Sequence, residues 1–417
     1  MTASTTTGRI GDYELIEELD RGGAGAVYVA QRSGPAGFKK RVALKLLSEA
    51  MTADRELLGR YVADLGRAAQ IDHPNVVQIL EVGEQDGRTF VVQEYVEGPS
   101  LERLLRKLHE SKKRLPMGLA ARVGADLAAA LQAAHERTEE GRPAGLVHGD
   151  LQADRVLISS ASGQVKLMGF GGAVLRPLAP RAGTPEGRMG QLAPECFEGA
   201  AADARSDIYA LGVILYRAAL GRAPFSGETD AALLGSVLRG NPMSPAKLDA
   251  KFPADLDRLI MGALARRPED RPAGAAEVRE GIEACLGSLS RASAADLKHV
   301  VGLVKSSTEP ALSPTPAPTA APRPEAPARE RRAPTPAPAA PPARTPAPAP
   351  TPTPAPAASP GRRRAQTQPF VPVESRTPQP VQQAAVAKPE ATAKPEATGS
   401  LWDELDRLER EFFPEKP

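Results

Sequence analysis

The sequence predicts an α+β fold with a small β-rich part, a larger helical part and a disordered C-terminal tail. Short apolar segments broken by glycine-containing turns occupy the chain up to Val96, as in antiparallel strands. Segments with apolar residues at helical spacing follow, and the alanine-rich stretch 117–137 is the longest of them. From about Ser306 the composition changes to Pro, Ala and Thr, which cannot bury a core.

Composition excludes several classes of protein. The formal net charge of +2 gives no electrostatic reason to expect a nucleic acid partner. The longest apolar run, 209–220, is interrupted by Arg217 and is too short to cross a bilayer. Cys196 and Cys285 lie far apart without further ligands nearby, which is usual in a reducing compartment and is not the spacing of a metal site. We therefore predict a cytoplasmic protein with no membrane partner and no nucleic acid partner.

The first strands are expected to enclose a glycine-rich turn. Residues 1–12 are predicted to be a disordered N-terminus, and Tyr13–Ile16 reads as the first strand. Residues 19–30 then read as strand, turn and strand. The turn carries three glycines, Gly22, Gly23 and Gly25, and such a turn lets backbone amides approach a phosphate. A glycine hairpin is more often only a turn, so this pattern alone is weak.

A strand, a helix and two more strands follow. Val42–Lys45 reads as a strand, and residues 55–71 have apolar residues at helical spacing. Residues 76–82 and 89–96 then alternate as strands do.

The most informative stretch runs from Leu146 to Ala173. Two short apolar segments, 156–158 and 165–167, predict a tight hairpin around a Ser-Gly turn. The tripeptide His148–Gly149–Asp150 precedes this hairpin, and Gly169–Phe170–Gly171 follows it.

These motifs resemble those of protein kinases, in particular the bacterial serine/threonine kinases. The kinase catalytic loop reads H-R-D-L-x-x-x-N and the metal loop reads D-F-G, where the first Asp is the base and the Asn and second Asp hold magnesium. Asp150 stands at the base position, but Arg155 replaces the Asn and Gly169 replaces the metal-loop Asp. With no metal ligand at either position, the resemblance is to a degenerate member, a pseudokinase.

The same resemblance implies an ATP site. Lys45 matches the lysine of the V-A-I-K strand that contacts the phosphates, and Asp64 stands where the partner acid of that lysine lies in the following helix. The loop over the phosphates would be formed by Leu19, Gly22, Gly23 and Gly25. Adenine would lie between Val27, Ala43 and Leu157 and bond to the backbones of Glu94 and Val96. These apolar residues would also be core in a protein without a ligand.

Other kinase-like positions are architectural. Asp207 matches the residue that holds the catalytic-loop backbone, and Glu195 and Arg271 match a buried ion pair. The resemblance thus implies a bilobal kinase fold over 13–289, with a short helix over 290–305.

The tail is expected to be a disordered linker over 306–399 that ends in an amphipathic helix over 400–413. The apolar face of that helix would dock into a protein partner, or fold back on the kinase-like domain. It would be formed by Leu401, Trp402, Leu405, Leu408 and Phe412.

Three functional hypotheses follow. The first is a pseudokinase scaffold or allosteric partner that binds ATP weakly and independently of magnesium. The second is an active atypical serine/threonine kinase in which Asp20 or Asp154 recruits the metal. The third is a small-molecule phosphotransferase, because His148–Gly149–Asp150 resembles the H-G-D loop of antibiotic-modifying kinases, although Ala193–Pro194–Glu195 favours the protein kinases.

Overall fold

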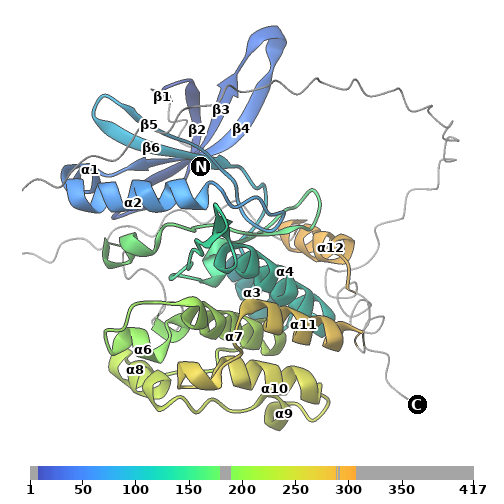
Figure 1. Cartoon of the computed structure of the whole chain (residues 1–417). Helices are drawn as coiled ribbons and strands as arrows, with labels where there is room; N and C mark the ends of the chain where they lie inside the picture. The colour runs from blue at the N-terminus through green and yellow to red at the C-terminus, as the bar shows by residue number, and fades with distance from the viewer. Residues whose placement is uncertain (1–7, 179–188, 288, 290–291, 307–417) are drawn as a thin grey trace, which may run out of the picture. The chain divides into compact units, whose positions relative to one another are not determined.

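The computed structural model describes residues 8–178, 189–287, 289 and 292–306. They form a β-rich N-terminal lobe and a helical C-terminal lobe (Figure 1). The predicted linker beyond Ser306 lies outside the described residues, and so does the predicted docking helix with Leu401, Trp402, Leu405, Leu408 and Phe412. No helix within the described ranges is long and apolar enough to cross a bilayer.

The N-terminal lobe is built on one antiparallel sheet, whose strands lie in the order β1-β2-β3-β4-β6-β5. Its strands are β1 (Gly8–Ile10), β2 (Tyr13–Gly22), β3 (Gly25–Ser33), β4 (Lys39–Leu47), β5 (Ile79–Gln85) and β6 (Arg88–Glu94). The prediction of a disordered segment over 1–12 is wrong for β1, which pairs with β2.

The two faces of the sheet differ because side chains alternate along each strand. In β4, Val42, Leu44 and Leu46 are buried in a small core on one face, together with Tyr28 and Phe90. The intervening Ala43 and Lys45 therefore lie on the opposite face. Helices α1 (Glu49–Ala53) and α2 (Arg55–Ala68) follow β4, and the Asp54 side chain caps α2 by accepting from Leu57 N at 3.0 Å.

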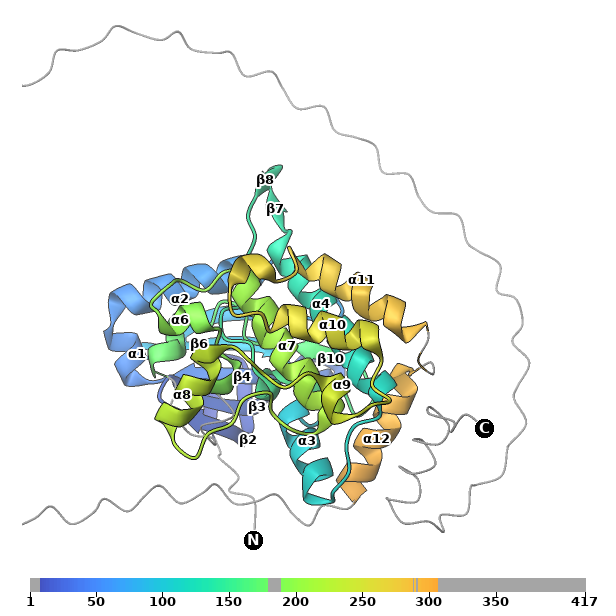
Figure 2. The same cartoon turned by 90° about the horizontal axis from the view of Figure 1, so that it is seen from below.

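The C-terminal lobe is helical (Figures 1 and 2), and its interior helices α4 and α7 are rich in small residues. Helix α4 packs against both α7 and α11, and alanine and glycine allow the helices to approach closely. The helices are α3 (Leu101–Glu110), α4 (Met117–His135), α6 (Pro194–Phe197), α7 (Ala204–Leu220), α8 (Asp230–Arg239), α9 (Pro245–Leu248), α10 (Ala254–Ala263) and α11 (Ala275–Leu286). Short 3-10 turns occur at η1 (Pro35–Gly37), η2 (Ala153–Arg155), η3 (Ala173–Leu178), η4 (Met189–Gln191) and η5 (Pro268–Asp270).

Two small hairpins interrupt the helices. Strands β9 (Val156–Ile158) and β10 (Val165–Leu167) pair antiparallel in the hairpin predicted from the sequence, with Gly163 at φ +74° in the turn. Strands β7 (Thr138–Glu139) and β8 (Arg142–Pro143) form a second, exposed hairpin that projects beyond α4 (Figure 2). This second hairpin was not predicted from the sequence.

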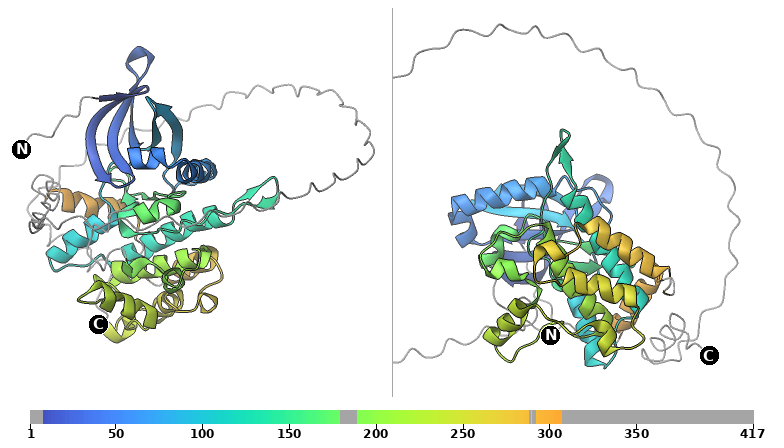
Figure 3. Two further views of the ribbon diagram at one scale, coloured as in Figure 1. Left: turned by 90° about the vertical axis from the view of Figure 1, so that its left-hand side faces the viewer. Right: turned by 60° about the horizontal axis from the view of Figure 1, so that its bottom comes forward.

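A further helix, α12 (Ala294–Ser306), packs against α3 (Figure 3). Its side chains Leu297, Val300 and Val301 are fully buried. The first turn of α12 lies so close to Gly163 that a Cβ there would meet the backbone oxygen of Ala294. This helix therefore belongs to the folded unit and is supported by the β9–β10 turn.

Candidate nucleotide and phosphoryl-transfer site

The backbone of the catalytic loop is held from below by Asp207, at the start of α7. The Asp207 carboxylate accepts hydrogen bonds from His148 N at 2.7 Å and from Gly149 N at 2.8 Å. His135 Nε2 lies 2.8 Å from the same carboxylate. Gly149 adopts φ +68°, a left-handed conformation that glycine accepts without strain. Asp207 thus fixes the turn that presents Asp150.

His148 connects this loop to the Gly-Phe-Gly segment. Its ring is fully buried and packs edge-on against Phe170, with ring centroids 4.8 Å apart. Burial lowers the pKa of His148, so the ring is neutral at physiological pH. Its Nδ1 accepts from Asp150 N at 3.3 Å, and its Nε2 donates to Met168 O at 3.0 Å. The two segments are therefore held together by a single neutral imidazole.

A second architectural contact joins α6 to the segment before α11. Arg271 donates through Nη1 and Nη2 to the two oxygens of Glu195, at 2.7 and 2.8 Å. The guanidinium also donates to the carbonyls of Ala265, Arg205 and Arg266. Arg271 is 4% exposed, so its charge is satisfied almost entirely by these partners.

Asp150 has both carboxylate oxygens engaged by side chains. Gln152 Nε2 donates to Oδ1 at 2.6 Å, and Arg155 Nη2 forms an ion pair with Oδ2. The Asp150 side chain is only 5% exposed. The contact of Gln152 was not predicted from the sequence, because this residue stands at one of the variable positions of the loop motif. The carboxylate is thus clamped from within its own loop.

The Arg155 side chain also covers Gly169. A Cβ at position 169 would lie 2.7 Å from Arg155 Nη1 and 3.3 Å from Arg155 Cδ. Gly169 has φ +103°, a conformation that disfavours other residues. The guanidinium therefore lies beside the position where kinases carry the metal-loop aspartate.

Lys45 projects from β4 over an aromatic ring of α2. Its Nζ lies 5.4 Å from the centroid of Tyr61, a cation–π distance. Burial is the main reason that the pKa of Lys45 falls to about 8. The nearby charge of Arg155 lowers it further, and Asp20 opposes this shift. No carboxylate among the described residues lies within ion-pair distance of this amine.

Asp64, the expected partner of Lys45, pairs instead with Arg67 one turn further along α2. The helix is nevertheless close to the Gly-Phe-Gly segment, since a Cβ on Gly171 would lie 3.0 Å from the backbone of Asp64. Helix α2 therefore packs against the Gly-Phe-Gly segment at Asp64. The shorter acid simply points to a neighbour on its own helix, and Tyr61 lies beneath the lysine.

The predicted adenine-facing residues share one face of the sheet. Val27 pairs with Lys45 across β3 and β4, and Ala43 pairs with Val29 and with Gln93 of β6. Val27, Ala43 and Lys45 are all half-buried, as is Leu157 in β9. Cross-strand partners project to the same side of a sheet, so Val27 and Lys45 lie side by side.

The glycine turn is shaped largely by its contacts with β4. Gly22 pairs with Gly25 at the end of the β2–β3 hairpin. Gly25 has φ +136° and lies so close to Leu46 that a side chain would not fit. Ser48 Oγ donates to Gly23 O at 2.8 Å, which ties the turn down. Leu19 lies at an irregularity of β2 and is 48% exposed.

Glu94 and Val96 end the sheet where the chain passes into the helical lobe. The Glu94 carboxylate forms an ion pair with Lys166 Nζ at 2.9 Å, and its backbone N–H donates to Gln78 O. Pro99 O accepts from Ile158 N at 3.0 Å, so this passage is fixed to β9. Val96 is 9% exposed.

Magnesium does not fit the residues that stand at its family positions. The ion takes oxygen ligands, whereas these positions hold a guanidinium, Arg155, and a glycine, Gly169. Asp20 and Asp154, the acids considered as replacements, are both exposed. No group of three or more His, Cys, Asp or Glu that could hold a metal occurs in the part of the chain that the structure describes.

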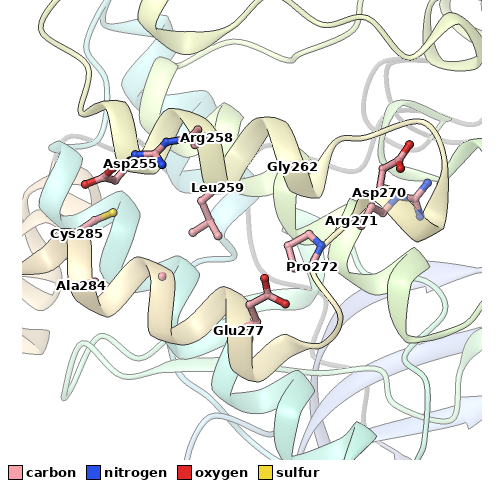
Figure 4. A pocket seen from close by; sticks show the side chains of 11 residues that line it. Asp255, Arg258, Leu259, Gly262, Asp270, Arg271, Pro272, Glu277, Ala284 and Cys285 are labelled. Atoms are coloured by element: carbon pink, nitrogen blue, oxygen red, sulfur yellow. Dashed lines mark hydrogen bonds and ion pairs between the residues drawn. The ribbon is translucent and has the colours of Figure 1, made fainter.

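A shallow groove of about 450 Å³ lies away from these residues, between α10 and α11 (Figure 4). Asp255, Arg258 and Leu259 line it from α10, and Glu277 and Cys285 line it from α11. Of the predicted site residues it contains only Arg271, which is committed to Glu195.

Most of the described chain is similar to known proteins. The family described as "Protein kinase domain" matches residues 13–281. Tyrosine-protein kinase MasK of Myxococcus xanthus is 33% identical over 279 residues, which cover 66% of this chain and 43% of MasK. Serine/threonine-protein kinase Pkn1 of Myxococcus xanthus is 33% identical over 292 residues, covering 69% of this chain and 40% of Pkn1. The chain thus spans about two-fifths of the length of these relatives.

A solved structure gives the same result for the fold. The crystal structure of the Mycobacterium tuberculosis PknI kinase domain aligns with a TM-score of 0.51 at 26% identity. The alignment covers 68% of this chain and 99% of that domain. The likeness confirms the bilobal fold that the sequence predicted.

Proposed function

Because the chain belongs to the protein kinase family, as its motifs predicted, we propose that it is a signalling pseudokinase that binds ATP and acts through protein partners. The observation that carries this proposal is the clamp on Asp150. The residue at the base position has one oxygen bonded to Gln152 and the other paired with Arg155.

Phosphoryl transfer depends on positioning and on stabilisation of charge, with little covalent chemistry by the protein. The base must accept a proton from the attacking hydroxyl, and a hydroxyl that reaches Asp150 has to share the carboxylate oxygens with Gln152 and Arg155. Loss of one preorganised electrostatic group typically lowers kcat by about 10²–10³. With both metal-ligand positions also replaced, we propose that transfer is very slow.

Binding of a nucleotide makes smaller demands. Among the described residues no acid lies within ion-pair distance of Lys45, whose amine contacts the Tyr61 ring, so Lys45 can contact a phosphate without giving up an ion pair to any of them. Val27, Ala43 and Leu157 remain half-buried and apolar. We propose that ATP is held by these residues and by the backbone at Glu94 and Val96.

Calorimetry on the full chain with ATP tests the binding. Lys45→Met is expected to lower the affinity at least about tenfold, the loss of one charge-assisted contact. Lys40→Met removes an exposed lysine of the same strand and is the matched control, which should bind as the wild type does. Absence of any binding by the wild type, or equal losses in the two variants, would refute the nucleotide site.

The second candidate is an active atypical kinase, and it is favoured by the intact support beneath Asp150. His148 and Asp207 hold the loop as an active site would need. Incubation with radiolabelled ATP decides between the two candidates. Incorporation of label that Asp150→Asn abolishes would establish the enzyme and refute the pseudokinase.

Protein partners are proposed at two places, the kinase-like domain and the segment 400–413. A cytoplasmic location is proposed with them. Deletion of 400–417 should remove partners that cross-link to the full chain in cells, while nucleotide affinity stays the same. If the same partners cross-link without this segment, docking through it is excluded.

A further inference from the structure

The residue at one lost metal-ligand position is itself a cation. Arg155 is 20% exposed, whereas Asp150, its partner, is 5% exposed, so the guanidinium is the member of the pair that solvent and ligands can reach. We propose that Arg155 takes the place of magnesium and binds the phosphates of a metal-free nucleoside triphosphate, exchanging Asp150 for the ligand. This inference rests on the proposed function, because it names the charge that holds the nucleotide.

Steric contact couples the two substitutions at the metal positions. The Arg155 guanidinium lies where a side chain at position 169 would begin, with Nη1 2.7 Å from the Cβ of any such residue. It also lies 3.5 Å from the Cβ that position 172 would carry. An arginine in this conformation therefore requires glycine at 169. The two changes together replace an acidic metal site by a basic one.

The charge of Arg155 adds to that of Lys45. The charge of Arg155 lowers the pKa of Lys45, an effect that Asp20 opposes only in part, and no described carboxylate lies within ion-pair distance of the Lys45 amine. A polyphosphate would bring negative charge to both cations at once. Arginine binds phosphate oxygens through two parallel N–H groups, which gives it geometric specificity as well as charge.

Asp150 competes with the ligand for the same guanidinium. A phosphate that reaches Arg155 has to displace the Asp150 carboxylate or share the guanidinium with it. Removal of the Asp150 charge should therefore strengthen nucleotide binding, whereas removal of the Arg155 charge should weaken it. If Asp150 and Arg155 acted on the nucleotide independently, the changes in binding free energy from the two substitutions would add in the double variant.

The test uses the full chain, ATP and calorimetry, with EDTA in one series and excess Mg²⁺ in the other. We expect wild-type affinity in EDTA to equal or exceed that with Mg²⁺, because the metal neutralises the charge that Arg155 binds. Arg155→Asn should lose roughly tenfold to a hundredfold in EDTA. Arg217→Asn breaks a partly buried ion pair with Glu102 elsewhere in the protein and is the matched control, expected to bind as the wild type does.

A double-mutant cycle tests the exchange. Asp150→Asn alone should raise the affinity for ATP severalfold. The same change should raise the affinity clearly less when Arg155→Asn is already present, since that variant has no guanidinium to release. Thermal unfolding of each variant checks that it is folded. Any of three results would overturn the inference. Arg155→Asn could bind ATP in EDTA as tightly as the wild type does, or the wild type could require Mg²⁺ for binding. Asp150→Asn could also raise the affinity equally with and without Arg155.

Two further ligands identify what Arg155 recognises. Inorganic tripolyphosphate should compete with ATP only at much higher concentration, because it lacks the adenine contacts. Adenosine should bind weakly and equally to the wild type and Arg155→Asn. Tripolyphosphate binding as tight as that of ATP would overturn the assignment of a nucleoside triphosphate. A wild type that binds none of these ligands refutes the proposed function itself. Nucleotide binding that is the same in the wild type and in Arg155→Asn refutes only the role of Arg155.

Discussion

Nucleotide binding should weaken as the pH rises through 8, because Lys45 then loses its charge. Burial and Arg155 lower the pKa of this amine to about 8. A bound phosphate stabilises the charged form, so the complex keeps its proton to higher pH. In the free protein the protonated fraction falls from about 0.9 at pH 7 to about 0.1 at pH 9, and the affinity should fall roughly tenfold between them.

Calorimetry with ATP in EDTA at pH 7, 8 and 9 measures this loss. A phosphate whose last pKa is about 6 is largely deprotonated at pH 7, so the charge of the ligand changes much less than that of Lys45 between pH 7 and 9. Lys45→Arg is the control, because arginine stays charged throughout and its affinity should not change with pH. A wild type whose affinity is flat from pH 7 to 9, or an equal slope in Lys45→Arg, would refute the reasoning.

The same shift in pKa has the opposite effect on the stability of the unliganded protein. Unfolded Lys45 has its ordinary pKa of 10.5, so between pH 8 and 10.5 the unfolded state binds more protons than the folded state. The free energy of unfolding therefore rises with pH in this window as far as Lys45 is concerned. Urea denaturation at pH 8 and 10 should show a contribution that Lys45→Arg lacks. Affinity and stability thus move in opposite directions for one physical reason.

Three further predictions concern stability and the loop. Arg271→Ala should destabilise the domain by about 3–5 kcal/mol in urea denaturation, because it leaves Glu195 without its partner. Arg267→Ala breaks an exposed pair and should leave the denaturation midpoint almost unchanged. Similar losses in the two variants would contradict the assigned burial. Leu297→Ala in α12 should lower the free energy of unfolding by about 2–5 kcal/mol, because Leu297 is fully buried. Lys298→Ala changes an exposed residue of the same helix and should leave the stability almost unchanged. An unchanged denaturation midpoint for Leu297→Ala would show that α12 does not pack as described. Asp207→Asn should speed hydrogen exchange at the backbone amides of His148 and Gly149, because these amides lose a charged acceptor. Unaltered exchange at these amides would exclude Asp207 as the residue that fixes the loop.

Much of the fold could be predicted from local sequence. The β9–β10 hairpin follows from two short apolar segments around Gly163, whose positive φ the turn requires. Strand β1 was missed because three residues, Gly8–Ile10, are too few to show a period and are recognised only through their pairing with β2. The β7–β8 hairpin was missed for the same reason, since each of its strands has two residues.

Side-chain partners in the site could be predicted less well, because they depend on which of several neighbours a flexible group selects. Counting along the chain placed Asp64 at the position of the partner acid, but its carboxylate pairs with Arg67 at a helical spacing that is always available locally. Alignment alone showed that Arg155 replaces an asparagine. It could not show that the guanidinium pairs with Asp150 and lies against Gly169, since both contacts depend on the side-chain conformation.

The retention of Asp150 has a physical explanation that does not require catalysis. A partly buried arginine without a counter-charge would cost several kcal/mol, so an arginine at 155 needs a carboxylate in reach. Asp150 supplies it, and Gln152 satisfies the remaining oxygen. Replacing the metal ligands with a cation therefore preserves the base position as an ion-pair partner. Asp207 is also needed for structure, because two backbone amides donate to its carboxylate. The presence of Asp150 and Asp207 is therefore a poor indicator of kinase activity in this chain.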